Sequence, residues 1–381
     1  MSFSLYVHIP YCLVKCPYCD FNAYGGRSWP EERYVDALCA ELRHAVAQPA
    51  WRAEPIETVY FGGGTPSLFA PASIERFLRL VAQLCPLAAQ AEISLEADPA
   101  SVSQDSLAGF GAGRVNRLSF GVQSFQSGLL KTLGRLHRSP DAQRAISWAR
   151  QAGFANLNLD LMFGVPGQTL ARLEADLEQV FACRPEHISI YNLSYEEGTP
   201  FFVWRQTGRL RPLDEELEVA MLELIQDRCS SHGYHQYEIS NFARPGFASQ
   251  HNRRYWTGHN YLGLGAGAHS FCREPGWGRR WSNEASPRTY MAKALSGGDA
   301  RCFAEDLSHD QARTEFMFLS LRQLDGFAPE TFAARFGLSL EAAFPQLHDL
   351  IDAGLLHHTA GRLKLTRRGL LIADTVFAAF A

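Results

Sequence analysis

The sequence of 381 residues lacks any long uncharged hydrophobic run. No segment approaches the roughly 18 apolar residues that a membrane-spanning helix needs, and Asp374 interrupts the apolar tail that begins at Leu370. The first residues, MSFSLYVHIP, lack the charged and apolar regions of a secretory signal. The sequence therefore predicts a cytoplasmic protein and leaves open a peripheral contact at the inner face of the membrane.

The chain also lacks an excess of positive charge. It has 36 Lys and Arg against 40 Asp and Glu, which gives a formal net charge of -4. Four basic residues near the end resemble the wing of a nucleic-acid-binding module: Arg362, Lys364, Arg367 and Arg368. Because phosphate binding needs a larger basic footprint, we expect no nucleic-acid partner and interpret these residues as solvated charges on a lid or docking element.

The nine cysteines lack the pairing of a disulfide framework or of a four-ligand zinc site. Three of them form a compact motif, Cys12-Leu-Val-Lys-Cys16-Pro-Tyr-Cys19. Thiolates bind iron–sulfur clusters, and three thiolates leave one iron of a four-iron cluster open to a chelating cofactor. The alternatives are three unrelated cysteines or a partial zinc site. The other six are widely spaced and are interpreted as small buried apolar residues: Cys39, Cys85, Cys183, Cys229, Cys272 and Cys302.

Short apolar segments alternate with amphipathic segments through the first two hundred residues. Six segments are predicted strands: Leu5–Ile9, Thr58–Phe61, Glu92–Glu96, Arg117–Phe120, Asn156–Met162 and His187–Asn192. This alternation indicates a parallel sheet with right-handed crossovers. Six strands fall short of the eight of a complete barrel, so we expect an α/β fold with an incomplete (β/α)6 barrel. A doubly wound sheet is the alternative.

The composition changes twice along the chain, which predicts three parts. Residues 1–212 form the partial barrel, and residues 213–304 form an extension. The extension begins with a helix over Leu213–His232 and continues through an irregular segment, Tyr237–Phe271, that is rich in Gly, Asn, His and aromatic residues. In residues 305–381, short helices precede a small hairpin and a final helix, which resembles a winged-helix module of the α+β class.

The CxxxCxxC motif at the end of the first predicted strand resembles the signature of the radical S-adenosylmethionine (SAM) superfamily. The segments YVHIPYCLVKCPYCDFN, YFGGGTPSLF and YEISNFARPGFASQHNRRYW are similar to its coproporphyrinogen III oxidase-like branch. The resemblance covers essentially the whole chain. It implies a [4Fe–4S] cluster on Cys12, Cys16 and Cys19, with SAM at the open iron as the source of a 5′-deoxyadenosyl radical.

The same resemblance assigns the SAM contacts residue by residue. They are Tyr6, Gly62, Gly63, Gly64, Thr65, Glu96, Gln123, Arg135 and Asp160. Thr65 departs from the wider superfamily, in which many members carry Glu, but GGGTP is the usual form in this branch. A surface or capping role is the alternative for each of these residues.

The branch includes oxygen-independent coproporphyrinogen III oxidases and heme chaperones of the HemW type. Phe21 stands where the oxidases usually carry a fourth cysteine, and the chain begins closer to the cluster motif than theirs. His251, Asn252 and Tyr255 fit the HNxxY pattern associated with heme binding in the chaperones, with His251 as an axial ligand. A structural histidine is the alternative for His251, and His269 is a weaker candidate ligand.

The resemblance thus implies a heme chaperone that delivers heme to hemoproteins such as membrane respiratory enzymes, with SAM cleavage secondary. Two enzymatic alternatives remain. One is oxidative decarboxylation of coproporphyrinogen III, and the other is a radical SAM methyltransferase that degrades heme. Whether the chain is an enzyme stays open, and so does the choice between monomer and homodimer.

Overall fold

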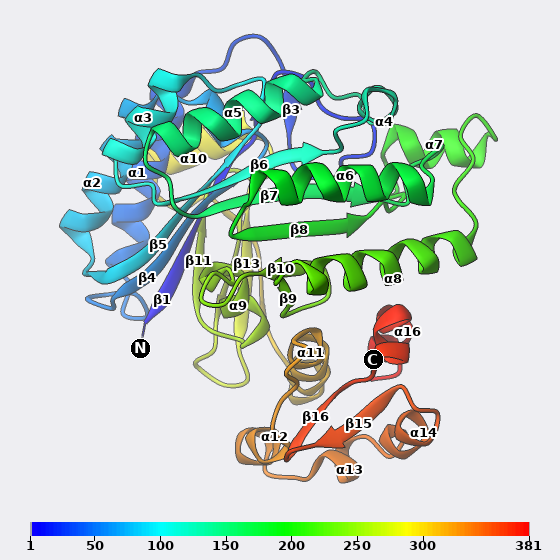
Figure 1. Ribbon diagram of the computed structural model, residues 1–381. Helices are drawn as coiled ribbons and strands as arrows, with labels where there is room; N and C mark the ends of the chain where they lie inside the picture. The colour runs from blue at the N-terminus through cyan, green and yellow to red at the C-terminus, as the bar shows by residue number, and fades with distance from the viewer. Residues whose placement is uncertain (1, 381) are drawn as a thin grey trace.

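The computed structural model describes residues 2–380, and its centre is a parallel sheet (Figure 1). The strands of this centre are β1 (Phe3–Ile9), β4 (Ile56–Gly63), β5 (Leu87–Ala97), β6 (Arg117–Gln123), β7 (Leu157–Phe163) and β8 (His187–Asn192). They lie side by side in chain order, and each neighbouring pair is parallel. All six predicted strands are confirmed, and so is the (β/α)6 arrangement.

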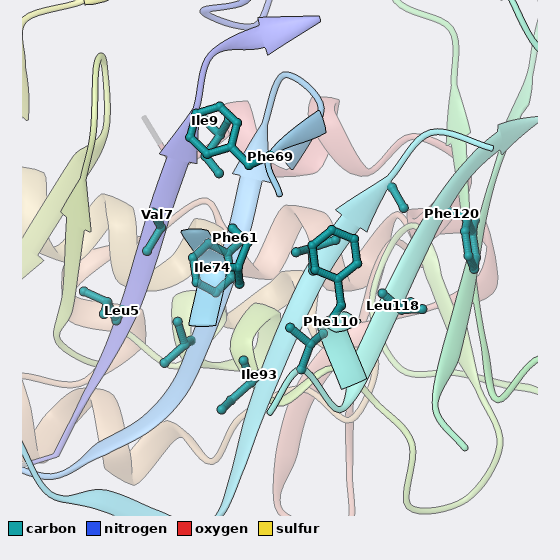
Figure 2. Close-up of a cluster of buried hydrophobic side chains, with 14 of the residues drawn as sticks. Leu5, Val7, Ile9, Phe61, Phe69, Ile74, Ile93, Phe110, Leu118 and Phe120 are labelled. Atoms are coloured by element: carbon teal, nitrogen blue, oxygen red, sulfur yellow. The ribbon is translucent and has the colours of Figure 1, made fainter. Parts of the chain in front are cut away.

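Helices on the outside of this sheet bury their apolar faces against it. They are α1 (Glu31–Val46), α2 (Pro71–Leu84), α3 (Gln104–Ala112), α4 (Ser127–Thr132), α5 (Ser139–Gln151) and α6 (Leu170–Cys183). Figure 2 shows Ile74 of α2 packed over Phe61 of β4, beside Val7 of β1. Each such buried side chain contributes about 1.5–3 kcal/mol to folding. This core holds the strands rigidly, so their carboxyl ends can present side chains at fixed positions.

The extension adds strands to both edges of the sheet. After α7 (Pro200–Gln206) and α8 (Glu215–Ser231), strands β9 (His235–Gln236) and β10 (Asn241–Ala243) join the β8 edge. Helix α9 (Gln250–Trp256) follows, and β11 (Tyr261–Leu264) pairs parallel with β1. Three antiparallel strands complete that edge, with helix α10 (Pro287–Gly297) before the last of them: β12 (His269–Cys272), β13 (Arg279–Asn283) and β14 (Arg301–Asp306).

The segment Tyr237–Phe271, predicted to be irregular, contains β10, α9, β11 and most of β12, joined by loops. Its glycines allow strands to approach closely rather than breaking them. A Cβ atom on Gly263 would lie 2.0 Å from the carbonyl oxygen of His269, so β11 and β12 can meet only with glycine at this position.

The C-terminal part has its own hydrophobic core, built from residues between Leu307 and Phe380 together with Phe271. Its helices are α11 (His309–Arg322), α12 (Pro329–Phe336), α13 (Leu340–Ala343) and α14 (Leu347–Asp352). The hairpin of β15 (Leu356–Thr359) and β16 (Arg362–Leu365) precedes α15 (Arg367–Leu371) and α16 (Ala373–Ala378). The predicted order of helices, hairpin and final helical segment is confirmed.

The basic residues of the C-terminal part bond mostly to the protein itself. Arg362 donates to the carbonyl oxygens of Asp325 and Gly326, and Arg367 pairs with Asp227. Arg368 donates to the carbonyl oxygen of Ala353. These charges therefore tie the hairpin region to its surroundings.

Two further findings concern the membrane and the scattered cysteines. None of the helices in the described part of the chain is long and apolar enough to cross a membrane. Of the six cysteines outside the motif, Cys39, Cys85, Cys229 and Cys272 are buried as expected. Cys183 is half-buried and Cys302 is exposed, which corrects the prediction for these two residues. Cys302 is exposed because β14 is the outermost strand of its edge.

Candidate functional site

The three motif cysteines lie on one loop at the carboxyl end of β1. The loop runs between the short strands β2 (Tyr11–Cys12) and β3 (Tyr24–Gly25), which pair with each other. Cys12, Cys16 and Cys19 are free, half-buried thiols that line a cavity of about 520 Å³. We call this space the first cavity.

The arrangement of these thiols fits a cluster better than a single metal ion. Residues 2–380 contain no group of three His, Cys, Asp or Glu side chains placed to share one ion. Three cysteines that bind separate irons of a cubane do not need to converge on one point. Burial raises the pKa of Cys12, and it raises the pKa of Cys19 to about 11, so cluster assembly must displace protons from these thiols.

Two hydrogen-bond donors face the cysteine sulfurs. The hydroxyl of Thr65 donates to Sγ of Cys12 at 3.4 Å, and Nη1 of Arg135 lies 3.7 Å from Sγ of Cys16. Arg135 is held in place by donating to Oδ2 of Asp98 at 2.6 Å and to the carbonyl oxygen of Gly121 at 2.7 Å. Such donors stabilise negative charge on the sulfur ligands of a cluster.

The glycine-rich turn after β4 brings its backbone against a carboxylate. Gly63 has φ +113, and a Cβ atom there would lie 2.4 Å from the ring of His8, so the position requires glycine. Its N–H donates to Oε2 of Glu96 at 3.1 Å, and the Tyr60 hydroxyl donates to Oε1 at 2.8 Å. Burial, and secondly the charge of Asp160, raise the pKa of Glu96 to about 7.

The next two strands contribute Gln123 and Asp160. Gln123 has φ +64 and follows a register irregularity between β6 and β7, a local distortion that redirects the side chain at the strand end. Asp160 accepts hydrogen bonds from Asn158 at 2.7 Å and from Ser119 at 3.1 Å. Burial raises the pKa of Asp160 despite these donors.

Most of the residues predicted to bind SAM line the first cavity together with the cysteines. They are Gly63, Gly64, Thr65, Glu96, Gln123, Arg135 and Asp160. Two do not line it. Gly62 packs beside the rings of Tyr60 and Tyr6, and the Tyr6 side chain lines a neighbouring cavity instead.

Sequence reasoning missed several polar residues of the first cavity. They are Tyr60, Asp98, Arg117, Ser119, Asn158, Ser189 and Tyr191. Most belong to the predicted strands, where polar side chains alternate with apolar ones, as in Arg117-Leu118-Ser119. Polar residues on one face of a strand in a buried sheet could therefore have indicated which side chains line the first cavity.

A second cavity of about 680 Å³ adjoins the first, and Phe21, Gly63 and Glu96 line both. Its walls come from the inner face of the barrel and from helix α11 of the C-terminal part. Most of its lining is aromatic or apolar: Tyr6, Tyr255, Trp256, Tyr261, Phe271, Phe318 and Leu319. Its polar lining consists of two histidines, His8 and His269, together with Asn22, Glu96, Arg280 and Glu315.

The structure separates the members of the predicted HNxxY pattern. Tyr255 lines the second cavity and Asn252 lines the first, but the buried ring of His251 lines neither. Thr58 donates to Ser4, so Nδ1–H of His251 donates to Thr58 Oγ1 at 2.7 Å. The other nitrogen, Nε2, accepts from the Tyr255 hydroxyl at 2.9 Å. In this arrangement no lone pair of His251 is free for iron.

The comparisons with known proteins match the whole chain. Residues 6–180 match the radical SAM superfamily, and residues 307–372 match the HemN C-terminal domain. The heme chaperone HemW of Bacillus subtilis is 37% identical, over 99% of this chain and 98% of its own. The chain belongs to the HemW family. A second curated member, from Escherichia coli, is 36% identical over 99% of this chain and 97% of its own.

A solved structure supports the fold of this HemW-family chain. The coproporphyrinogen III oxidase HemN of Escherichia coli superposes with a TM-score of 0.85, covering 100% of this chain and 90% of that one, at 24% identity. As a radical SAM protein, the chain carries a [4Fe–4S] cluster and binds SAM. The three thiols, the glycine-rich turn and the carboxylates of the first cavity fit both groups.

Proposed function

We propose that this protein is a heme chaperone that binds heme and passes it to hemoprotein acceptors. The observation that carries the proposal is the second cavity, whose aromatic walls suit a large flat hydrophobic ligand and which adjoins the cluster site. Its volume of about 680 Å³ lies within the usual range of roughly 300–1,000 Å³ for ligand pockets. The curated relatives named above are heme chaperones.

The first cavity has a separate task in this proposal. Cys12, Cys16 and Cys19 hold the cluster, which supplies one-electron chemistry when present. Glu96 accepts from the backbone of the glycine turn and presents a carboxylate to the SAM amine, while Arg135 and Gln123 face the same space. The exposed ring of Phe21 lies where the two cavities meet. At this position, two residues after Cys19, the chain therefore presents an apolar group rather than a thiol.

Several finer points stay predictions. They are delivery to membrane respiratory enzymes, peripheral contact with the membrane, the cytoplasmic location, the oligomeric state and the division at residues 212 and 304. Direct heme ligation by His251 also stays a prediction, and it requires both hydrogen bonds of its ring to open.

The test uses the full-length protein with its cluster reconstituted anaerobically. Heme is added in steps while the Soret band is followed, and coproporphyrinogen III consumption is assayed in parallel with SAM and a reductant. We expect stoichiometric heme uptake, transfer of the bound heme to an apo-hemoprotein, and no porphyrinogen turnover. Turnover to protoporphyrinogen without specific heme uptake would make the chain an oxidase.

A further inference from the structure

His137 lies between α4 and α5, two residues after the arginine that faces the sulfur of Cys16. Its side chain is fully buried. Nε2 lies 3.0 Å from the carbonyl oxygen of Val122, and because a carbonyl oxygen only accepts, Nε2 carries the proton of the neutral ring. The lone pair is then on Nδ1. This nitrogen is therefore the atom of the ring that can gain a second proton.

The surroundings of Nδ1 suit a charged ring better than a neutral one. Among residues 2–380, this buried nitrogen has no hydrogen-bond partner. A carboxylate oxygen, Oδ1 of Asp98, lies 3.9 Å from it. A lone pair and a carboxylate oxygen repel each other, whereas a proton on Nδ1 turns the same contact into an ion pair. The contact with Asp98 thus favours the imidazolium form of His137.

Asp98 connects this ring to the cluster loop. Its other oxygen, Oδ2, accepts from Nη2 of Arg135 at 2.6 Å, and Nη1 of the same arginine lies 3.7 Å from Sγ of Cys16. Asp98 also lines the first cavity, so its carboxylate lies between the buried ring and the space that admits solvent. His137, Asp98 and Arg135 therefore form a continuous chain of charged groups that ends at a cluster ligand.

The charges around the ring keep it neutral in the described state. They are Asp98 after β5, Arg135 on the same segment and Asp141 of α5. Burial, and secondly the charge of Arg135, lower the pKa of His137 from 6.5, although the two carboxylates act in the opposite direction. An electron added at the cluster attracts the charge of Arg135 and leaves Asp98 more able to stabilise a protonated ring. The pKa of His137 should therefore rise on reduction.

From this arrangement we propose that His137 takes up a proton when the cluster is reduced, with Asp98 as the relay. One electron passes from a one-electron reductant to the cluster. One proton passes from the solvent of the first cavity, by way of Asp98, to Nδ1 of His137, where an N–H bond forms. Because the proton compensates the added charge, reduction is easier at low pH. His137 is a positioning residue that acts through Asp98 and Arg135, and this role does not depend on heme.

The test follows the midpoint potential of the cluster in the full-length, anaerobically reconstituted protein, without heme or SAM. Dithionite titrations monitored by electron paramagnetic resonance run from about pH 5 to about pH 9, around the ordinary pKa of histidine. In wild type the potential should become more negative as the pH rises, by up to about 59 mV per pH unit, which is a tenfold change in the equilibrium constant for one electron. His137→Gln, whose amide can still donate to Val122 but does not titrate, should abolish this slope.

His187→Gln is the matched control. His187 is a buried histidine of β8 that lines neither cavity, and its two ring nitrogens are hydrogen-bonded to Asn158 and to Tyr237. This variant should keep the wild-type slope. Asp98→Asn removes a charge that raises the pKa of His137, so it should move the sloping region to lower pH. A pH indicator in weakly buffered solution gives a second readout, the protons taken up per electron.

The outcomes decide the role of His137 separately from that of the second cavity. A wild-type potential that is independent of pH would overturn the inference, and so would a slope that survives in His137→Gln. Cluster absorbance shows whether each variant is loaded. If His137→Gln does not assemble the cluster, Asp98→Asn decides, because an unchanged sloping region in that variant would also overturn the inference. None of these readouts involves heme, so failure here leaves the chaperone proposal standing, and absence of heme uptake leaves this inference standing.

Discussion

The two adjoining cavities differ in composition and in how the chain builds them. The first is lined mainly by polar and charged side chains, and its main residues follow the ends of successive strands in short motifs, as in Cys12 to Cys19 and Gly63 to Thr65. The second is mostly aromatic and apolar, and its residues come from β1, α9, β11, β12, β13 and α11. Motifs along the chain therefore encode the cluster site, whereas the pairing of distant strands assembles the proposed cargo site.

The largest expected difference between the two cavities follows from removing one cysteine ligand. Cys16→Ser should abolish the cluster, because a hydroxyl is a poor substitute for a thiolate on iron. Heme uptake should persist, because Cys16 lines the first cavity and not the second. Iron content and the electron paramagnetic resonance signal of the reduced protein measure the first effect, and the Soret titration measures the second.

Cys302→Ser is the matched control for this change, since Cys302 is a free and exposed thiol on β14. It should leave both the cluster and heme uptake unchanged. Loss of heme uptake in Cys16→Ser would show that the two cavities act as one site.

A smaller effect is expected at Glu96, which lines both cavities. Because its pKa is raised to about 7, the carboxylate that attracts the SAM amine is present above pH 7 and is lost as the pH falls through that value. Wild-type SAM affinity should therefore fall between about pH 8 and about pH 6. Glu96→Gln should bind SAM about tenfold more weakly at high pH, with little pH dependence.

Isothermal titration of SAM into the anaerobic protein measures these affinities. Glu75→Gln is a suitable control, because Glu75 is an exposed residue of α2 that pairs with Arg79. An unchanged pH profile in Glu96→Gln would remove Glu96 from the SAM site.

The raised pKa of Glu96 also affects the stability of the protein without ligands. Burial also raises the pKa of Glu41 to about 7, and the unfolded value for both carboxyls is near 4.5. The folded state holds extra protons between these values. This contribution to the free energy of unfolding is thus complete below pH 4.5 and is lost as the pH rises to about 7. The decline should appear in the difference in unfolding free energy between wild type and Glu41→Gln, measured by denaturant titration, because buried histidines with lowered pKa values, such as His251, contribute with the opposite sign to the total. A flat difference across this range would contradict the raised pKa of Glu41.

The smallest expected effect is at Thr65, whose hydroxyl donates to Sγ of Cys12. Thr65→Val keeps the shape and removes the donor, so the reduction potential of the cluster should become more negative. A redox titration followed by electron paramagnetic resonance checks this. Thr257→Val, on the turn after α9, should leave the potential unchanged, and an equal shift in both variants would exclude a direct effect of the hydrogen bond.

The sequence allowed prediction of the parallel strands because each is a short apolar run followed by turn residues, and of the cluster loop because its ligands are close in the chain. It did not allow prediction of β11 to β14. Their glycines and aromatics carry no periodic pattern, and Gly263 is explained only by the carbonyl group of His269 on the neighbouring strand. The burial of His251 could not be predicted either, because its hydrogen-bond partner Thr58 lies 193 residues away in the chain.

The ion pairs of Arg280 connect two parts of the chain across the second cavity, which bears on how a ligand could leave it. Glu305 belongs to the sheet, but Glu315 lies on α11, which packs within the separate C-terminal core. Phe318 and Leu319 of the same helix form part of the wall of the second cavity. A rigid-body tilt of the C-terminal part would have to break the ion pairs Arg280–Glu315, Arg322–Glu238 and Arg367–Asp227, and it would open the second cavity while the strands of the barrel keep their hydrogen bonds. Loading and unloading would then cost far less than any unfolding of the barrel.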